Sequence, residues 1–310
     1  MLLAACSGDA PPPDGPPAED GSGRAESSPA ATRPKVLVIG IDGVRPDVLA
    51  EVPTPALDGL IAQGAYTDSA RTGFPSVSGP GWSSMLTGVW SDKHGVTDNE
   101  FGGKNYEAYP GFLDRIEQLR PELNTFAAVD WTPLALAEDG SVALGSRIDE
   151  RQIVDGYEIG WAEADEWSVD AAAEHLRSGD PDALFVYLGN PDEVSHETGA
   201  IGREYREAIE LADRHVARLL DAMRERATWA DEDWLVLVST DHGRLPTGGH
   251  GGDTPEERTI FYLAAGPSVE PGRPEGPVHV VDVAVTALAH LGFEADPTWG
   301  LEGRVVGLRR

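Results

Sequence analysis

Three histidines and three aspartates are the residues of this sequence whose types and spacing could hold a metal. Asp192 precedes His196 by four residues, Asp241 directly precedes His242, and His250 follows in a glycine-rich run. Imidazole and carboxylate groups without thiolates suit zinc or a related transition metal. The spacing therefore predicts a metal centre, to which the third aspartate, Asp42, is added below.

A serine near the middle of Thr72–Gly88 could supply the reactive atom. This stretch is rich in glycine, proline and small residues, and Ser78 stands among them. A serine hydroxyl is a poor nucleophile at neutral pH unless a base or a metal activates it. We therefore expect Ser78 to be a metal-activated nucleophile.

Three apolar runs predict the strands that position the aspartates. Residues 35–41 end at Asp42, residues 182–188 end shortly before Asp192, and residues 234–239 end just before Asp241. Uninterrupted hydrophobicity is typical of strands buried on both faces. If the strands are parallel, all three carboxylates lie at one edge of the sheet, where open α/β sheets bind their ligands. Each aspartate alone could be a turn or cap residue, but their joint occurrence favours a site.

The remaining patterns predict the rest of one domain. Strands alternate with helices, which predicts an α/β fold with a largely parallel central sheet and helices on both faces, in a single catalytic domain of residues 35–310. Further strands are expected at 124–129 and 260–264, short ones around 146–148 and 153, and helices at 56–62, 111–120, 161–177, 203–227 and 281–291, the last with Asp282 as its N-cap.

The first 34 residues have a different composition. Residues 7–34 contain proline, glycine and scattered acids but no aromatic residue, which is typical of a disordered tether. Leu3 to Cys6 resembles the end of a bacterial lipoprotein signal, with a lipid anchor at Cys6. Only five residues precede Cys6, fewer than a signal needs, so we interpret residues 1–34 as a truncated signal-like start and a tether. This predicts an extracytoplasmic protein, membrane-anchored or secreted, with a cytoplasmic protein as the alternative.

Composition restricts the partners. The net charge is -29, from 53 acidic and 24 basic residues, which argues against binding to nucleic acid or to an anionic membrane. A phosphate-bearing substrate must therefore be attracted locally. Cys6 is the only cysteine, which excludes an internal disulfide.

Several separated motifs resemble the alkaline phosphatase superfamily, and most closely its type I phosphodiesterase and nucleotide pyrophosphatase family. Their order along the chain matches that family from about residue 36 to the end. The matching segments are 38–43, 75–80, 84–88, 94–96, the pair Asp192 and His196, 240–243, 249–251 and 300–307.

The resemblance implies two divalent metals, for which we expect zinc, and a small phosphate ester or nucleotide as substrate. Ser78 would become transiently phosphorylated. Asn99, 21 residues after Ser78, would donate to a phosphoryl oxygen together with the backbone amide of Ser78 or Gly79, although a turn role for Asn99 remains open. One metal would be bound by Asp42, Ser78, Asp241 and His242, and the other by Asp192, His196 and His250.

Alternative activities are weighed by what they require. A sulfatase of the superfamily needs arginine four residues after the residue oxidised to formylglycine, and Trp82 stands there, which disfavours it. A phosphomonoesterase should supply an arginine near the phosphoryl group, for which Arg45 and Arg71 are candidates. A phosphoglycerate-mutase-like isomerase would need a large inserted domain, and a silent binding module would not need the intact ligand set. Phosphodiester or pyrophosphate hydrolysis is therefore the leading hypothesis.

Overall fold

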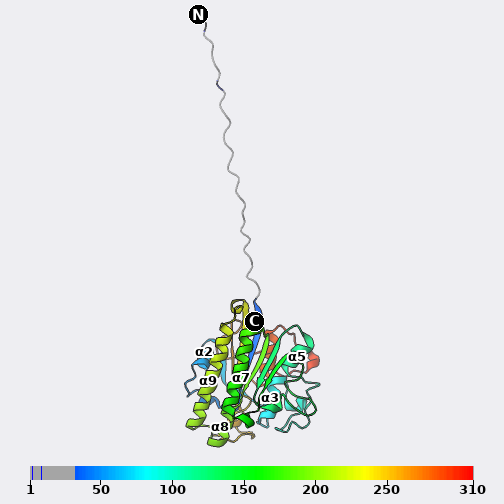
Figure 1. The fold of residues 1–310 in the computed structure, drawn as a ribbon, viewed down its shortest axis with the longest axis vertical. Helices are drawn as coiled ribbons and strands as arrows, with labels where there is room; N and C mark the ends of the chain where they lie inside the picture. The colour runs from blue at the N-terminus through cyan, green and yellow to red at the C-terminus, as the bar shows by residue number, and fades with distance from the viewer. Residues whose placement is uncertain (1, 3–7, 9–31, 310) are drawn as a thin grey trace. The chain divides into compact units, whose positions relative to one another are not determined.

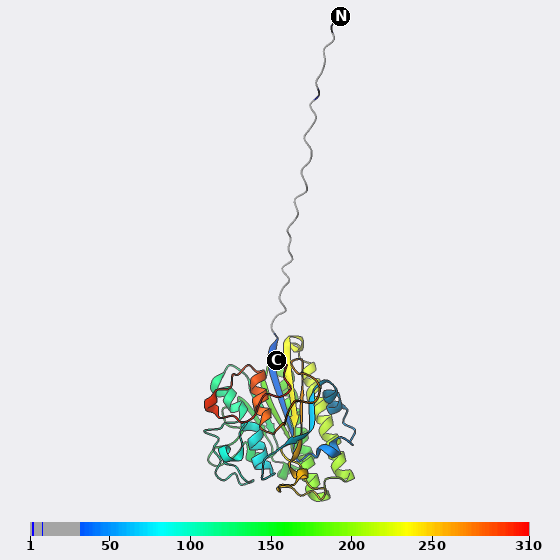
Figure 2. The same cartoon turned by 180° about the vertical axis from the view of Figure 1, so that it is seen from behind.

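A seven-stranded sheet forms the centre of the protein in the computed structural model, which describes residues 2, 8 and 32–309. The strand order is β2-β7-β6-β1-β5-β3-β4, and helices lie on both faces (Figures 1 and 2). All the strand pairs are parallel except those that β7 makes with β6 and β2. The predicted α/β fold with a largely parallel sheet is confirmed.

The strand bounds follow the apolar runs closely. The bounds are β1 Arg33–Ile41, β2 Ala65–Arg71, β3 Thr125–Val129, β4 Glu150–Ile153, β5 Ala183–Leu188, β6 Glu232–Ser239 and β7 Thr259–Ala265. In β1, Val36 and Val38 pack into one core, whereas Leu37 and Ile39 pack into the other. Alternate residues of a strand point to opposite faces, so a run buried on both faces must be apolar throughout.

Helices cover the two faces as separate layers. One core lies beneath α2 (Pro55–Gln63), α7 (Trp161–Ser178) and α9 (Arg203–Arg224), which are labelled in Figure 1. The other core is covered by α3 (Ser78–Thr87), α5 (Phe112–Leu119) and α11 (Asp282–His290). The short helices are α1 Pro46–Leu49, α4 Ser91–His94, α6 Gly156–Ile159, α8 Asn190–Thr198 and α10 Pro255–Arg258, with 3₁₀ turns at Thr132–Leu134, Trp229–Asp231 and Pro297–Trp299.

Two local expectations were wrong. Asp282 is the first residue of α11 rather than its N-cap, and its carboxylate accepts hydrogen bonds from the amides of His279 (2.8 Å) and Arg304 (2.8 Å). It therefore ties the start of α11 to the C-terminal segment. Of the short strands expected around residues 146–148 and 153, only the second is present, since residue 153 ends the half-buried edge strand β4, whereas residues 146–148 form a turn.

The predicted lipid anchor at Cys6 lies outside the described residues, as does most of the predicted tether. Arg33 and Pro34, which were assigned to the tether, already pair with β6 as the first residues of β1. Among the helices of the described part, none is long and apolar enough to span a membrane.

Candidate metal centre and nucleophile

Three neighbouring parallel strands bring the aspartates together. The strands β6, β1 and β5 are adjacent in the sheet, and Asp241, Asp42 and Asp192 follow their carboxyl ends. Asp42 comes directly after β1, and Asp192 lies in the first turn of α8, at the bottom of Figure 1. All three side chains are buried. The predicted convergence at one edge of the sheet is therefore what the structure contains.

His242 lies between the three carboxylates. Its Nε2 is 3.5 Å from Asp42 Oδ1, 3.4 Å from Asp241 Oδ2 and 3.7 Å from Asp192 Oδ1. Two groups of side-chain ligand atoms close enough to hold an ion form around it, one with Asp42 and Asp241 and one with Asp192 and His250. His242 thus joins the two halves of the predicted ligand set.

The other two histidines meet at the mouth of the site. His196 Nε2 lies 3.1 Å from Asp192 Oδ2 and 3.1 Å from His250 Nε2. The rings of His242 and His250 stack with centroids 3.9 Å apart. Because α8 places Asp192 and His196 one turn apart, both side chains project from the same face of that helix.

Backbone carbonyls fix the protonation of two imidazoles. The Nδ1 atom of His242 lies 3.0 Å from the Gly243 carbonyl oxygen, and Nδ1 of His250 lies 3.0 Å from the Ser76 carbonyl oxygen. A carbonyl can only accept, so each Nδ1 carries the proton and each Nε2 presents a lone pair, that of His250 toward His196 Nε2. This is the tautomer that metal-binding histidines adopt.

Ser78 begins helix α3 beside this cluster. Its Oγ is 3.2 Å from His242 Nε2. The glycines of the motif permit this placement, since a Cβ at position 81 would lie only 2.9 Å from the Asp241 carbonyl oxygen and 3.0 Å from the Asp241 Cβ. The helix can therefore approach the loop after β6 closely only with glycine at position 81.

Asn99 is anchored to the same helix. Its Oδ1 accepts a hydrogen bond from the Gly79 amide at 2.7 Å, which leaves Nδ2 as its donor group. We expect the backbone amide of either Ser78 or Gly79 to donate to a substrate oxygen. Because the Gly79 amide already donates to Asn99, the Ser78 amide is the one left for this role. Both N–H groups belong to the first turn of α3, where backbone donors lack partners within the helix.

A small cavity of about 60 Å³ contains most of the predicted site. Six of the predicted residues line it, with four aromatic residues and one acid at its walls. These are Asp42, Ser78, Asn99, Asp192, His196 and His250, then Trp131, Tyr157, Trp161, Tyr187 and Glu193. Asp241 and His242 lie fully buried behind them.

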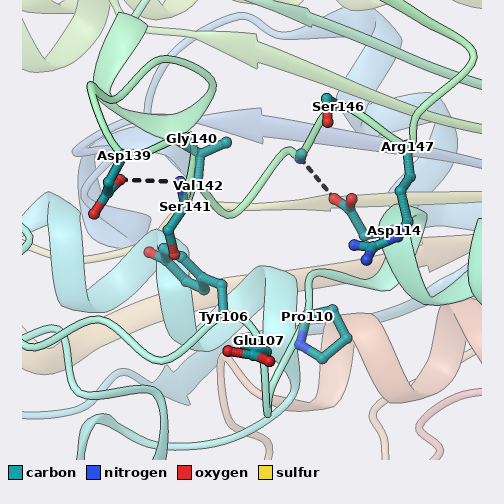
Figure 3. Close-up of a pocket in the computed structure, with 11 residues that line it drawn as sticks. Tyr106, Glu107, Pro110, Asp114, Asp139, Gly140, Ser141, Val142, Ser146 and Arg147 are labelled. Atoms are coloured by element: carbon teal, nitrogen blue, oxygen red, sulfur yellow. Dashed lines mark hydrogen bonds between the residues drawn. The ribbon is translucent and has the colours of Figure 1, made fainter.

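A larger cavity of about 340 Å³ lies elsewhere and is shown in Figure 3. It is lined by Glu107, Asp114, Asp139 and Arg147 among others, and by none of the predicted site residues. The Asp114 carboxylate in its wall already accepts a hydrogen bond from the Gly145 amide at 2.6 Å. Its larger volume therefore does not make this cavity the reactive site.

The crowded carboxylates perturb one another in the metal-free protein. Burial and the nearby Asp192 carboxylate raise the pKa of Asp42 to about 7. Burial and Asp42 likewise raise the pKa of Asp241 well above its ordinary value. Burial also acts to raise the pKa of Asp192, but the Arg244 guanidinium and the hydrogen bond to His196 outweigh it and lower that pKa. Three carboxylates buried together are stable in their ionised forms only when positive charge lies beside them.

The ligand atoms fit divalent metals. Within residues 32–309, nothing donates a hydrogen bond to the buried atoms Asp42 Oδ1 and Asp241 Oδ2, while Asp42 Oδ2 accepts from Trp82 Nε1 (2.9 Å) and Tyr187 Oη (2.6 Å). These two donors orient the Asp42 carboxylate and leave its other oxygen free. Orphaned carboxylate oxygens beside imidazole lone pairs are the donor set that zinc prefers.

Sequence reasoning missed the supporting residues. The apolar run of residues 182–188 predicts only a strand position for Tyr187, and the sequence distinguishes Arg244 only by its place two positions after His242. Of the arginines considered, Arg45 pairs with Asp47 and Arg71 bonds to Thr259. Tertiary contacts decide these roles, and the only local signal was the proximity of Arg244 to the Asp241-His242 motif.

Comparison with known proteins agrees with this geometry. Residues 36–256 match the family model described as type I phosphodiesterase / nucleotide pyrophosphatase. The bis(5'-adenosyl)-triphosphatase ENPP4 of Bos taurus is 24% identical over 226 residues, which cover 70% of this chain and 49% of that protein. Ectonucleotide pyrophosphatase/phosphodiesterase family member 7 of Mus musculus is 22% identical over 233 residues, covering 70% and 51%. The chain thus spans about half the length of the curated relatives it matches.

Solved structures show the same fold. Murine ectonucleotide pyrophosphatase/phosphodiesterase 5 in complex with AMP matches with a TM-score of 0.67 at 16% identity, covering 86% of this chain and 96% of that one. A 2-O GAG sulfatase matches with a TM-score of 0.70 at 13% identity, covering 88% and 73%. At these identities the likeness concerns the fold, so the chemistry must be argued from the site.

Proposed function

Because this chain belongs to the type I phosphodiesterase / nucleotide pyrophosphatase family, we propose that it hydrolyses phosphodiester or pyrophosphate bonds with Ser78 as nucleophile. One observation carries the proposal. The Ser78 hydroxyl lies 3.2 Å from His242 Nε2, which stands among three buried carboxylates, and two of these carboxylates have an oxygen with no hydrogen-bond partner among the described residues.

The ligand set would hold two divalent metals, for which we propose zinc. Asp42, Ser78, Asp241 and His242 would hold one ion. Asp192, His196 and His250 would hold the other. When bound, the two ions lower the pKa of the serine hydroxyl and of water and offset the charge of the substrate phosphate.

The chain's own groups perform the transfer. Ser78 Oγ attacks phosphorus, the bond from phosphorus to the leaving oxygen breaks, and the leaving group departs with the serine proton, so a serine phosphodiester that keeps the substrate's other group forms. Asn99 Nδ2 and the Ser78 amide donate to a nonbridging oxygen as charge develops on it. Water then attacks phosphorus in this serine ester, the bond from phosphorus to Oγ breaks, one water proton returns to Oγ, and the phosphate monoester is released. The buried walls around Asp241 and His242 keep bulk water from the ligands.

Diesters or pyrophosphates are favoured over monoesters. Among the described residues that line the cavity there is no lysine or arginine, and Asn99 is a neutral donor. A monoester carries an extra negative charge that such walls do not match. Nucleotides are the substrate class that we propose, since one relative is named a bis(5'-adenosyl)-triphosphatase and a related structure holds AMP.

A phosphomonoesterase remains the second candidate, because the Arg244 guanidinium adds positive charge behind Asp192. A sulfatase is disfavoured, since Trp82 fills the position of the required arginine and its indole is committed to Asp42.

We also propose an extracytoplasmic location with a lipid anchor at Cys6, which rests on the signal-like residues 3–6 alone. Labelling with radioactive palmitate and membrane fractionation of the wild-type protein and the Cys6→Ser variant test it. Label and membrane location that do not depend on Cys6 would exclude the anchor.

Matched aryl esters test the activity. The zinc-loaded protein should cleave bis(p-nitrophenyl) phosphate and the p-nitrophenyl ester of thymidine 5'-monophosphate faster than p-nitrophenyl phosphate. Ser78→Ala should abolish turnover and keep the metal content measured by mass spectrometry. Ser84→Ala is the control, because Ser84 is a buried serine of the same helix that bonds to His94 (3.0 Å) rather than to the site. Faster monoester turnover would reverse the substrate order, and an active Ser78→Ala variant would exclude the nucleophile.

A further inference from the structure

A fully buried arginine contacts one of the proposed metal ligands at two points. Arg244 follows the Asp241-His242 pair after a single glycine. Its Nη2 forms an ion pair with Asp192 Oδ1, and its Nη1 donates to the Asp192 main-chain oxygen at 3.1 Å. One guanidinium therefore holds both the side chain and the backbone of Asp192.

The surroundings hold this arginine in place. Arg45 Nη1 donates to the Arg244 carbonyl oxygen. The turn after β1 passes directly over the pair, since a Cβ on Gly43 would overlap Asp192 Oδ1 and lie 3.1 Å from Arg244 Nε. Gly43 also has a positive φ of 63°, which disfavours other residues at this position. The guanidinium thus has a defined position before any metal binds.

The contacts divide the two oxygens of Asp192 between different partners. Oδ1 pairs with Arg244 and lies 3.7 Å from His242 Nε2, whereas Oδ2 lies 3.1 Å from His196 Nε2, on the side of His250. We propose that Arg244 is a positioning residue that directs Asp192 Oδ2 toward the metal held with His196 and His250. The inference rests on the proposed metal set. Lysine could not replace the arginine, because a single ammonium lacks the planar fork that reaches two oxygens at once.

A role of Arg244 as a positive charge and a role as a positioning residue predict opposite effects of its removal on cation binding. Three carboxylates and a serine alkoxide balance two divalent ions, so Arg244 leaves the centre with one positive charge. If the guanidinium acted only as a charge, its removal would strengthen cation binding. If it positions Asp192, its removal frees the carboxylate and weakens cation binding, typically by about 10- to 100-fold for a partner of a metal ligand.

Zinc titration of the full chain distinguishes these effects. Chelator-stripped wild-type protein, Arg244→Met and Arg244→Lys are titrated with Zn²⁺ against a chromophoric competitor, and with Co²⁺ to record the visible spectrum of the bound ion. We expect two equivalents in the wild type, with one of the two bound about 10- to 100-fold more weakly in both variants and a changed Co²⁺ spectrum. Arg226→Met is the matched control. Arg226 pairs with the buried Glu232 at the amino end of β6, which is the end of the strand away from the metal centre.

Each outcome has one meaning. Unchanged or tighter zinc binding by Arg244→Met overturns the positioning role, and wild-type binding by Arg244→Lys overturns the two-point contact. Weakening to the same extent in Arg226→Met shows a general loss of stability and also overturns the proposal. If Arg244→Met does not fold, Arg244→Gln replaces it, because glutamine is neutral and keeps one donor group. A wild-type protein that binds fewer than two ions contradicts the proposed function instead.

Discussion

The stability of the protein in the absence of metal should depend on pH because the pKa of Asp42 is raised. Burial and Asp192 raise the pKa of Asp42 from 3.8 to about 7 in the folded protein. Between these values the folded chain keeps a proton on Asp42 that the unfolded chain releases. The stability that this carboxyl contributes is therefore complete below pH 3.8 and is lost as the pH rises through 7.

The size of the effect follows from the pKa difference. Each pH unit well between the two pKa values removes about 1.36 kcal/mol from the free energy of unfolding, and the slope halves at the folded pKa, so the loss between pH 5 and pH 7 is about 2 kcal/mol. Urea unfolding in EDTA, followed by tryptophan fluorescence at pH 5, 6 and 7, measures it in the wild type and in Asp42→Asn. The difference between the two proteins cancels the contribution of Asp165, whose pKa is also raised by burial to about 7, and it reports Asp42 together with the part of the Asp241 pKa shift that Asp42 causes.

Asparagine does not titrate, so the variant should lack this fall. Saturating zinc should abolish it in the wild type, because bound cations favour the ionised carboxylate. A difference between wild type and Asp42→Asn that stays constant from pH 5 to pH 7 in EDTA would refute the reasoning. A fall of the same size with saturating zinc would show that Asp42 does not bind the metal.

Three further substitutions test the supporting contacts. Trp82→Phe removes the indole donor to Asp42 and should weaken zinc binding about tenfold in a competition titration, while the Tyr187 donor remains. Asn99→Ala should lower kcat about 100-fold with unchanged metal content, and a change in KM alone would contradict its role at the transition state. Glu257→Ala removes the acceptor of the Gly252 amide (2.8 Å), so hydrogen exchange of residues 250–254 should increase and zinc binding should weaken. Unchanged exchange there would show that the loop is held by other contacts.

Strands were predictable where burial on both faces demanded an apolar run. The uninterrupted runs that end at Asp42 and before Asp192 and Asp241 are therefore predicted as strands, and they form β1, β5 and β6. The strand β2 was missed because Asp68 and Ser69 interrupt its pattern at an irregularity in the pairing with β7. Edge strands are exposed in part, so their sequences carry a weaker signal.

The helix α3 could not be read from its residues. It contains two glycines and a proline, which are poor helix formers, yet all ten of its residues are buried. Tertiary packing therefore stabilises it against its local preference. The site was predictable where ligands follow strand ends, but the roles of Trp82 and Arg244 depend on contacts with residues 40 and 52 positions away.

The adjacency of β6, β1 and β5 separates two properties that evolution could change independently. The positions of Asp42 and Asp241, which directly follow or nearly follow β1 and β6, are set by the hydrogen-bonded sheet, in which neighbouring strands lie about 4.8 Å apart regardless of side chains. The cavity mouth is instead built by the segments outside the sheet that carry Asn99, Trp131, Tyr157 and Glu193. Variation in these segments can alter which ester is accepted while the reactive centre keeps its geometry, so specificity is best re-engineered at the mouth.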